Sequence, residues 1–176
     1  NDKPWVIVAF HHPPYTKGSH DSDEEYDSRG RMQDMREIFL PMLEQAGVDL
    51  VLSGHSHMYE RSHLIDCAYG TSTEFSEENI VSQGFEGKQK QYQKPLPLGA
   101  HQGTIYTISG SSSKVDNGPM DHPAHHIGLR EAGSMVIDVV GNKLTARFVN
   151  NEGQVKDEFS ITKDAEFSSE YQGCNR

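Results

Sequence analysis

The fold is decided by one stretch of the chain, Val48-Asp49-Leu50-Val51-Leu52-Ser53-Gly54-His55-Ser56-His57-Met58-Tyr59-Glu60-Arg61. Its apolar first part is typical of a buried strand, and two histidines follow where that strand should end. With one small residue between them, both imidazoles can point the same way, and Gly54 lets the backbone turn without steric cost. Imidazole is the commonest metal ligand among protein side chains. A metal site here would need further ligands from elsewhere in the chain.

A second strand followed by histidines lies near the N-terminus. Trp5-Val6-Ile7-Val8-Ala9-Phe10 is an unbroken apolar run, which is typical of a parallel strand covered on both faces. It ends at His11-His12-Pro13-Pro14, where the two prolines stop further strand pairing.

A helix is predicted between these two strands. Apolar residues recur there at helical spacing and give one apolar stripe: Met35, Ile38, Phe39, Met42, Leu43 and Ala46. Pro41 falls inside the stripe and should kink the helix or start a second short one, because it has no N–H to donate. Gly47 is a suitable C-terminal cap.

Strand, helix and strand in this order predict a βαβ unit with parallel strands and a right-handed crossover. In open α/β sheets, ligands bind beyond the carboxyl ends of the strands. Because His11 and His55 each follow such an end, we expect these two distant histidines to converge on one edge of one sheet.

Composition sets limits on the function. The 176 residues suit one domain. Only 34% of them are hydrophobic, but the clear apolar runs argue against general disorder. The formal net charge of −10 argues against a broad nucleic-acid or anionic-membrane surface. No apolar segment approaches the roughly 18 to 20 residues needed to span a bilayer. Since residues near Asn1 already resemble a strand, the natural N-terminus is expected to lie further upstream.

The rest of the chain is predicted to alternate between long loops and antiparallel strands. Residues 67–102 are polar with little periodicity and predict a surface excursion, and a further loop holds residues 121–126. Short strands are predicted over 61–65 and 104–108. Residues 134–140 and 143–149 flank Gly141-Asn142, a hairpin signal, and residues 154–161 predict a third antiparallel strand. We place the domain at residues 1–163 and a polar tail at residues 164–176.

Cys67 and Cys174 are the only cysteines. They form no C-x-x-C pair, so a thiolate zinc site is not predicted. A disulfide in an exported protein and two free thiols both fit the sequence.

Three histidines form the candidate metal site: His11, His55 and His57. A His-x-His pair alone is more typical of hydrogen-bonded structural residues. Three neutral imidazoles at the ends of neighbouring strands instead favour a transition-metal site. A dinuclear centre would also need carboxylates, one of them bridging, and no aspartate stands at a predicted strand end.

These motifs resemble a known family. Phe10-His11-His12-Pro13-Pro14-Tyr15 together with Gly54-His55-Ser56-His57-Met58-Tyr59-Glu60-Arg61 resembles the calcineurin-like metallophosphoesterases, and is most similar to their purple acid phosphatase branch. The segments Gly103-Thr104-Ile105-Tyr106 and Ser109-Gly110-Ser111 are also similar to that branch. The resemblance covers most of residues 3–162. It implies an α/β fold, namely the C-terminal half of a four-layer α/β/β/α sandwich with a mixed sheet and an antiparallel hairpin region near the C-terminus.

The resemblance also implies roles for individual residues. His11 and His55 would bind the second metal of a dinuclear centre and His57 the first, and His20 would contact the phosphate or protonate the leaving group. The ions would be two divalent or trivalent transition metals, Fe with Zn or Mn or another pair. The acidic residues around His20 would repel a phosphate unless cations offset them. An ordinary solvated loop histidine is the alternative for His20.

The function implied is a metal-dependent phosphoester hydrolase, a phosphomonoesterase of the acid phosphatase type that uses a metal-bound hydroxide. A phosphodiesterase or nucleotidase on the same scaffold is the alternative, as is a catalytically incomplete domain that binds metal or protein. The family's N-terminal aspartate and Gly-Asn-His motifs do not occur here. We therefore expect an incomplete active site whose other ligands come from a missing N-terminal half. The partner would be a small phosphorylated substrate, and the resemblance favours a secreted or periplasmic location.

The remaining motif residues are given supporting roles or none. Tyr59, Glu60 and Arg61 are predicted to pack behind the histidine turn and to fix it through an ion pair, and His12 to support the ligands rather than join them. The loop histidines His122, His125 and His126 are compatible with a substrate rim or an adventitious metal site, but a loop without specific function is favoured. His63 and His101 receive no role.

Overall fold

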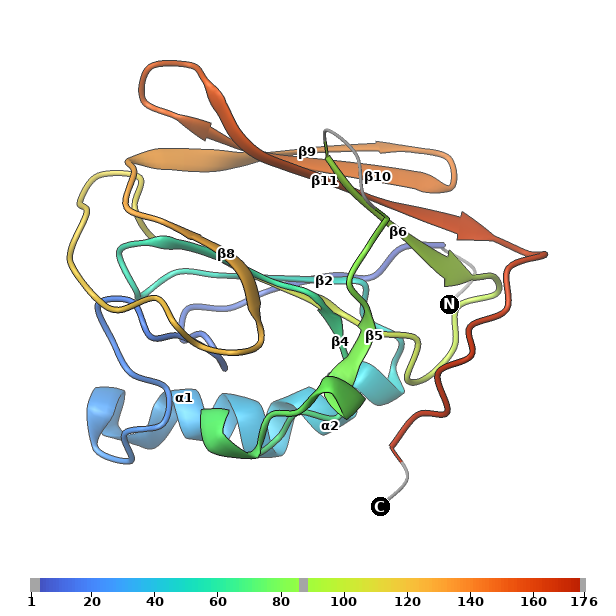
Figure 1. Ribbon diagram of the computed structural model, residues 1–176, viewed down its shortest axis with the longest axis horizontal. Helices are drawn as coiled ribbons and strands as arrows, with labels where there is room; N and C mark the ends of the chain where they lie inside the picture. The colour runs from blue at the N-terminus through green and yellow to red at the C-terminus, as the bar shows by residue number, and fades with distance from the viewer. Residues whose placement is uncertain (1–3, 86–88, 175–176) are drawn as a thin grey trace.

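The computed structural model describes residues 4–85 and 89–174 of the chain. Figure 1 shows three layers, with a helical segment on one face of a five-stranded sheet and a four-stranded sheet on its other face. The prediction of an α/β fold with mixed sheets is thus confirmed. The fourth layer of the expected sandwich is not among the elements of the described residues and stays a prediction.

The central sheet contains the predicted βαβ unit. Its strand order is β1-β2-β7-β3-β8, with β1 at Ile7–Ala9, β2 at Leu50–Ser53, β7 at Ile105–Ser109, β3 at Tyr59–Ser62 and β8 at His125–Leu129. β1, β2 and β7 run parallel, whereas β3 pairs antiparallel with both β7 and β8. The first two strands therefore end at the same edge of the sheet. The loop predicted over residues 121–126 was wrong at its C-terminal end, because β8 begins at His125.

β1 is less covered than its apolar sequence suggested. It is an end strand of this sheet, and Ile7 is 39% exposed. The prediction of a strand buried on both faces was therefore wrong for this chain, because the face that carries Ile7 is exposed among the described residues.

One helical segment links β1 to β2. It contains the turn η1 (Asp27–Gly30), α1 (Arg31–Asp34), the π-helical turn η2 (Met35–Phe39) and α2 (Leu40–Gln45). The second short helix expected near Pro41 is present as α2, and the wider π turn directly precedes the proline, which cannot donate a backbone hydrogen bond. Gly47 follows the helix at φ +73° in the left-handed region, as a cap requires.

The buried face of this helix differs from the predicted apolar stripe. Ile38, Phe39 and Met42 are 56%, 45% and 56% exposed, so half of the predicted stripe faces outward. Leu43 of the same stripe packs against the core. The covered positions are spaced four apart and include two charged residues: Met32, Arg36, Leu40 and Glu44. Arg36 donates to the backbone carbonyls of Pro14 and Ser22, which lets a charged side chain replace an apolar one there. Apolar periodicity alone therefore indicated the wrong face.

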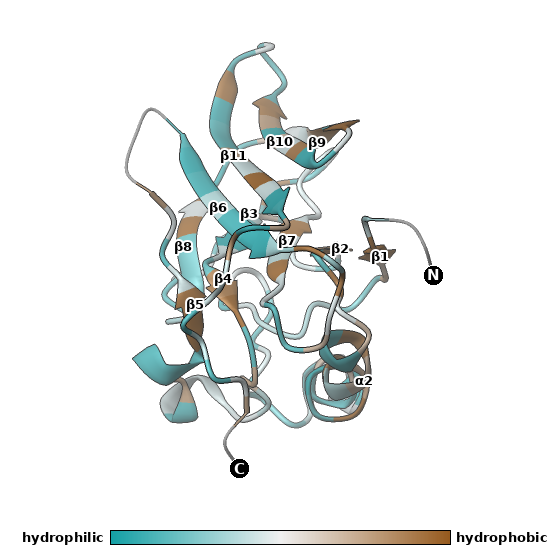
Figure 2. Ribbon diagram, turned by 90° about the vertical axis from the view of Figure 1, so that its right-hand side faces the viewer, coloured by the Kyte–Doolittle hydropathy of each residue, from teal (hydrophilic) through white to brown (hydrophobic). Residues whose placement is uncertain are grey.

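The second sheet has the order β6-β11-β10-β9, with β9 at Gly133–Val140, β10 at Lys143–Asn150, β11 at Val155–Asp164 and β6 at Lys90–Pro95. The predicted hairpin at Gly141-Asn142 and the third antiparallel strand are confirmed. Figure 2 shows the alternating apolar and polar bands along β10 and β11 that identify such half-buried strands.

The predicted surface excursion over residues 67–102 was wrong in part. It contains β6, which pairs in parallel with β11, and β5 (Ile80–Ser82), which pairs with β4 (Leu64–Ile65); two single turns, Ser72–Glu74 and Glu77–Asn79, lie between them. β6 escapes recognition because its inward positions are Tyr92 and Lys94 rather than aliphatic residues. Its polar sequence conceals a strand whose inward side chains are buried.

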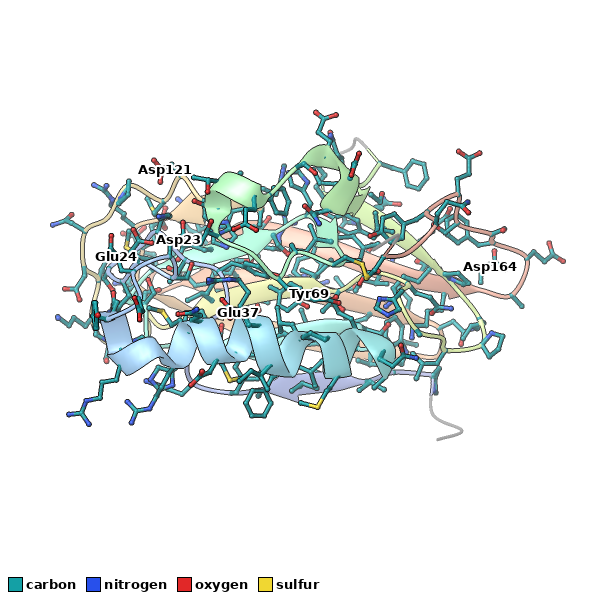
Figure 3. All side chains as sticks on the ribbon, turned by 90° about the horizontal axis from the view of Figure 1, so that it is seen from below. Asp23, Glu24, Glu37, Tyr69, Asp121 and Asp164 are labelled. Atoms are coloured by element: carbon teal, nitrogen blue, oxygen red, sulfur yellow. A yellow bond between two sulfur atoms is a disulfide. The ribbon has the colours of Figure 1, made fainter. Side chains whose placement is uncertain are left out.

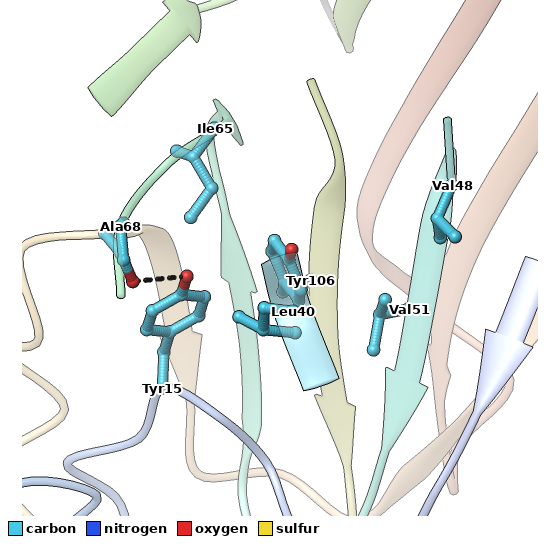
Figure 4. Close-up of a cluster of buried hydrophobic side chains, with 8 residues drawn as sticks. Tyr15, Leu40, Val48, Val51, Ile65, Ala68 and Tyr106 are labelled. Carbon is cyan, nitrogen blue, oxygen red and sulfur yellow. Dashed lines mark hydrogen bonds between the residues drawn. The ribbon is translucent and has the colours of Figure 1, made fainter. Parts of the chain in front are cut away.

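Two apolar cores lie on opposite faces of the central sheet. Val51 and Tyr106 face the helix and pack with Leu40 and Tyr15, whose hydroxyl donates to the Ala68 carbonyl at 2.8 Å (Figure 4). Their neighbours Leu50 and Ile105 face the second sheet and its Phe159 and Ile161. The period-two alternation of β2 and β7 thus fills both interlayer spaces.

Buried charges also join the two sheets. Asp49, directly before β2, forms ion pairs with Lys94 Nζ at 2.6 Å and with Lys163 Nζ at 2.7 Å, and all three side chains are 0% exposed. Burial lowers the pKa of Lys94 to about 8, although the Asp49 carboxylate opposes the shift. Toward the other end, Arg61 donates two hydrogen bonds to Asp157 of β11 at 2.6 and 2.9 Å.

The C-terminal segment runs back across the molecule after β11. Cys174 forms a disulfide with Cys67, and Figure 3 shows the bond close to Tyr69. The disulfide joins residues 107 positions apart in the sequence and thereby ties residues 165–174 to the core. The domain boundary after residue 163 stays a prediction, and β11 ends at Asp164. Among the described residues, none of the helices has the length and apolar character that a bilayer crossing requires.

Candidate metal centre

The carboxyl ends of β1 and β2 bring two histidine loops together. The Gly54 N–H donates to the His11 carbonyl at 3.2 Å, and His11 Nε2 lies 3.1 Å from His55 Nδ1. The predicted convergence of His11 and His55 is therefore present in the structure. We call the group of His11, His12, His20, His55 and His57 the histidine edge.

The turn after β2 depends on close backbone approaches. His55 has φ +65°, a conformation that costs energy for a side chain with a Cβ. A Cβ on Gly110 would lie 2.2 Å from the Ser56 carbonyl oxygen, so only glycine allows the loop after β7 to lie against this turn. Ser56 Oγ accepts from the Ser19 N–H, and the His57 N–H donates to Ser19 Oγ. The turn is thus held from two sides.

His12 joins His11 and His55 in a group of possible ligands. One ring nitrogen from each of the three lies within 4.8 Å of the others, a spacing that a single ion can bridge. His12 was expected only to support the ligands. The adjacent pair His11-His12 was the signal in the sequence.

His20 meets His55 from the polar loop. The two rings stack with centroids 3.9 Å apart, and His20 Nδ1 lies 2.9 Å from Asp27 Oδ1. Ser28 Oγ lies 2.5 Å from His55 Nε2. His20, Asp27 and His55 form a second group whose ligand atoms lie within 4.8 Å of one another. Asp27 was not singled out from the sequence, because five acidic residues crowd that loop and nothing distinguished it.

The backbone at Ser28 is left-handed over consecutive residues. Ser28, Arg29 and Gly30 have φ values of +55°, +59° and +74°. Two non-glycine residues in this region are costly, and such conformations cluster at functional sites. The turn places the Ser28 hydroxyl against His55 immediately before the helix begins.

His57 lies outside both groups. Its Nδ1 is 2.7 Å from Asp116 Oδ2, and Lys114 Nζ contacts the same carboxylate at 2.8 Å. A carboxylate on one ring nitrogen orients the ring and leaves the other nitrogen for a metal. The expected set His11, His55 and His57 is thus divided by the structure into a pair that touches and a third ring with its own carboxylate.

The acidic loop is neutralised in part. Lys17 Nζ lies 2.7 Å from Asp21 and 2.9 Å from Asp23, and Asp23 also accepts from the Ser72 N–H. For Asp27, burial opposes ionisation, but hydrogen bonds from the Asp21 N–H and the Ser28 hydroxyl hold its pKa below the usual value. Lys17 and these donors therefore reduce part of the negative charge that would repel a phosphate.

The electrostatics favour neutral imidazoles. Burial, together with the neighbouring His20, His12 and His11, lowers the pKa of His55 to about 4. Burial and the charges of His11, Arg31 and His20 also lower the pKa of His12. Metal binding requires the neutral ring, so these nitrogens are available as ligands at neutral pH.

Tyr59, Glu60 and Arg61 support the turn from behind, and their partners come from other elements. Arg61 and the Tyr59 hydroxyl both bind Asp157 of β11. Glu60 accepts from Thr16 Oγ1 at 2.5 Å and lies 3.2 Å from His125. The predicted ion pair therefore exists, but it links the turn to the second sheet.

The loop histidines have defined environments. His122 is 3% exposed, its Nδ1 accepts from the Ala124 N–H, and burial lowers its pKa to about 2. The side chain of His125 is also 3% exposed, against Glu60. These two residues are therefore part of the folded core, and the expectation that they have no specific function stays a prediction.

An open groove lies beside the histidine edge. It has a volume of about 310 Å³ and is bounded by the ends of β1, β2 and β7 and by Met135 of β9. Its lining includes His11, Gly54 and Ser109. A small ligand in this groove would touch His11.

Comparison with known proteins finds similarity to phosphoesterases. Residues 1–59 match the model of the calcineurin-like phosphoesterases, a segment that ends just after the histidine turn. Purple acid phosphatase 18 of Arabidopsis thaliana is 34% identical over 97 residues, which cover 53% of this chain and 20% of the relative. The phosphoenolpyruvate phosphatase of Allium cepa is 42% identical over 62 residues, covering 35% of this chain and 11% of the relative.

Solved structures agree on the fold. A purple acid phosphatase from yellow lupin (Lupinus luteus) seeds superimposes with a TM-score of 0.66 at 19% identity, over 98% of this chain and 28% of that one. The inner membrane complex anchor of Plasmodium gives a TM-score of 0.57 at 19% identity, over 92% of this chain and 39% of that one. The chain spans at most 20% of the length of the two curated relatives compared. This chain is thus similar to the calcineurin-like phosphoesterases over residues 1–59, and to purple acid phosphatases in sequence and fold.

Proposed function

We propose that this chain carries part of the active site of a metal-dependent phosphoester hydrolase, a phosphomonoesterase of the acid phosphatase type. The observation that carries the proposal is the convergence of His11, His12 and His55 at the ends of two parallel strands, with ligand nitrogens within 4.8 Å. Three converging imidazoles, with the pKa values of His12 and His55 lowered by burial, suit a transition-metal ion. The relatives named as phosphatases support the reaction class.

In this proposal the histidines serve two metal ions. His11 and His55 hold the second ion and His57, oriented by Asp116, holds the first; Fe with Zn or Mn is one suitable pair. When bound, the ions supply Lewis-acid activation of the phosphoryl group. The position of His12 beside His11 and His55 makes it a further candidate ligand.

His20 is proposed as the residue that acts on the leaving group. Its Nδ1 is engaged by Asp27, so a proton for the leaving oxygen would come from Nε2. Stacking on His55 holds the ring beside the proposed ligands. Asp27 in turn is held by the Asp21 N–H and by Ser28, which fixes the orientation of the pair.

The site is proposed to be incomplete within these 176 residues. A dinuclear centre needs a bridging carboxylate, and the two histidine groups found among the described residues contain one carboxylate, Asp27, already engaged by His20. The exposed side chains of Ile38, Phe39 and Met42, together with the uncovered edge of β1, offer an apolar surface for an adjoining segment. We propose that the remaining ligands lie on that segment, upstream of Asn1.

Two other functions are the alternatives to a phosphomonoesterase. A phosphodiesterase or nucleotidase could use the same metal ligands with different pocket loops. A non-catalytic domain that binds metal or protein is the alternative of a different class, because the same fold occurs in a protein described as an anchor.

The test is hydrolysis of p-nitrophenyl phosphate and of a p-nitrophenyl phosphodiester with added Fe, Zn or Mn. It compares this chain, a form extended upstream of Asn1, and the extended form with His55→Asn. Asparagine tolerates the left-handed backbone at position 55 but removes the imidazole. We expect metal-dependent monoester hydrolysis by the extended form, lowered at least 100-fold in the variant. Faster diester hydrolysis would favour the first alternative, and no turnover by the extended form would contradict the enzyme proposal.

A further inference from the structure

A second cluster of ligand atoms lies away from the histidine edge. It consists of Asp66, Cys67, His101 and Cys174, whose ligand atoms all lie within 4.8 Å of one another. His101 Nδ1 is 3.1 Å from Asp66 Oδ1, 3.4 Å from Cys174 Sγ and 3.9 Å from Cys67 Sγ. The four side chains come from the end of β4, the loop before β7 and the C-terminal segment.

These separations resemble those of a tetrahedral zinc site. With bonds of about 2.0–2.3 Å, the ligand atoms of such a site lie roughly 3.3–3.8 Å apart. The three distances from His101 fall near this range. The Cα atoms of the two cysteines are 5.6 Å apart, so their side chains project from neighbouring backbone positions. Once the two sulfurs are no longer bonded, a rotation about their side-chain torsions would complete the set.

The backbone presents these ligands in an unusual way. Cys67 and His101 have φ values of +60° and +55°, in the region that L-residues rarely adopt. Strained residues of this kind persist where the surrounding structure holds them, and they cluster at functional sites. The Cys67 N–H donates to Glu44 Oε2 at 3.0 Å, and the His101 N–H donates to the Glu44 carbonyl at 3.0 Å. Glu44 therefore anchors both residues.

The cluster is also accessible. A cavity of about 440 Å³ is lined by Cys67, Cys174, Tyr171 and residues of the turn at 76–79. Asp66 is fully covered, whereas the His101 side chain is 26% exposed. A reductant can thus reach the disulfide, and an ion can enter beside it.

We propose that Asp66, Cys67, His101 and Cys174 form a Zn²⁺ site in the reduced protein, so that the metal and the disulfide are alternative ways of holding the C-terminal segment. Two thiolates, one imidazole and one carboxylate are a suitable ligand set for zinc. This site is independent of the phosphatase proposal.

The disulfide is replaced by the metal site in two steps, reduction and then Zn²⁺ binding. A dithiol attacks the Cys67–Cys174 bond, first forming a mixed disulfide and then leaving as a cyclic disulfide. The S–S bond breaks, the dithiol loses two electrons and two protons, and both cysteines become thiols. Zn²⁺ then displaces the two thiol protons, which pass to solvent.

Cobalt(II) substitution of the complete 176-residue chain tests the proposal. The chain is reduced with a phosphine, because a dithiol reagent would itself bind cobalt. Near-ultraviolet circular dichroism checks that the reduced chain keeps its fold. We expect an intense sulfur-to-cobalt charge-transfer band at about one equivalent of Co²⁺, removed by an equivalent of Zn²⁺. The oxidised chain should show no such band, although its histidine edge can still bind cobalt through nitrogen.

Variants separate a built site from two thiols that bind metal adventitiously. Cys174→Ser should abolish the two-thiolate band, while His101→Asn and Asp66→Asn should each weaken Co²⁺ binding by ~100-fold. His63→Asn, a histidine substitution outside the cluster, should change nothing. An unaltered band in both His101→Asn and Asp66→Asn, or no band in the folded reduced chain, would overturn the proposal. If reduction unfolds the chain, zinc added during refolding should restore the near-ultraviolet signal of the wild type but not of His101→Asn; no restoration would equally overturn it.

Discussion

At the carboxyl ends of β1 and β2, imidazoles face other imidazoles; between the two sheets, each buried charge faces an opposite one. His55 has His11 on one ring nitrogen and Ser28 on the other, and its stacking partner is His20. Asp49, in contrast, meets two lysines with no exposed surface on any of the three side chains. Clustered polar residues thus serve two purposes in this molecule. Opposite charges that pair in the interior stabilise the fold, whereas imidazoles that gather at an edge of the sheet are suited to binding a ligand.

The largest effect is expected between the sheets. Asp49→Asn would leave Lys94 and Lys163 buried without a counter-charge, and breaking a buried ion pair in this way costs about 3–5 kcal/mol. Urea unfolding of the wild type and the variant measures this loss. Asp138→Asn, which removes an exposed partner of Arg147, is the control and should leave the midpoint unchanged. Equal midpoints for all three proteins would show that the buried pairing does not stabilise the fold.

The next effect depends on pH and on His122. Burial, with a contribution from His125, lowers the pKa of His122 to about 2, while in the unfolded chain it stays near the usual value of about 6.5. Below pH 6.5 the unfolded chain therefore binds more protons, and stability falls as the pH decreases. Between pH 7 and 4.5 we expect His122 to account for a loss of ~1–3 kcal/mol.

His122→Asn measures this contribution. The amide oxygen can replace Nδ1 as the acceptor for the Ala124 N–H, and the residue no longer titrates. The dependence of the unfolding free energy on pH should become shallower between pH 7 and 4.5, whatever the absolute stability of the variant. The same slope in both proteins would contradict a buried neutral His122.

A smaller effect is expected at the carboxylate of His57. Asp116→Asn removes the charge that orients the ring, and loss of such a partner typically weakens metal binding by ~10-fold. Calorimetric titration with Zn²⁺ would measure it, with Lys114→Met as a control that alters the neighbouring charge but keeps the carboxylate. If the lysine variant weakens binding and the aspartate variant does not, Asp116 does not act through His57.

The smallest effect on stability should come from the outward helix face. Phe39→Ser replaces a side chain that is 45% exposed, and surface substitutions usually change the free energy of unfolding by less than about 0.5 kcal/mol. Leu40→Ser, at the fully buried neighbouring position, should destabilise strongly. In a form extended upstream of Asn1, however, Phe39→Ser should lower stability as well. If Phe39→Ser leaves the free energy of unfolding of the extended form unchanged, this contradicts the proposal that an adjoining segment packs on this helix face.

The sequence predicted the elements that carry regular apolar patterns. The βαβ unit, the hairpin at Gly141-Asn142 and the meeting of His11 with His55 all follow from periodicity and from the topology of parallel strands. The same reasoning failed for polar residues that are buried against a polar partner. Lys94 in β6 is buried because Asp49 pairs with it, and Arg36 faces the core because two carbonyls accept from it.

The candidate site was predicted only in part for a related reason. His12 and Asp27 become candidates through tertiary contacts, whereas in the sequence they are one of two adjacent histidines and one of several loop acids. The pairing of Cys67 with Cys174 likewise required the path of the C-terminal segment. Patterns along a chain report which side chains share a face, but not which loops fold over that face.

The central claim is that the histidine edge binds a transition metal through His55. Calorimetric titration of the oxidised 176-residue chain with Zn²⁺ tests it most directly, since the disulfide keeps Cys67 and Cys174 out of the measurement. We predict saturable binding by the wild type, weakened at least 100-fold in His55→Asn and unchanged in His63→Asn, with both variants folded. Equal Zn²⁺ binding by the wild type and His55→Asn would contradict the account.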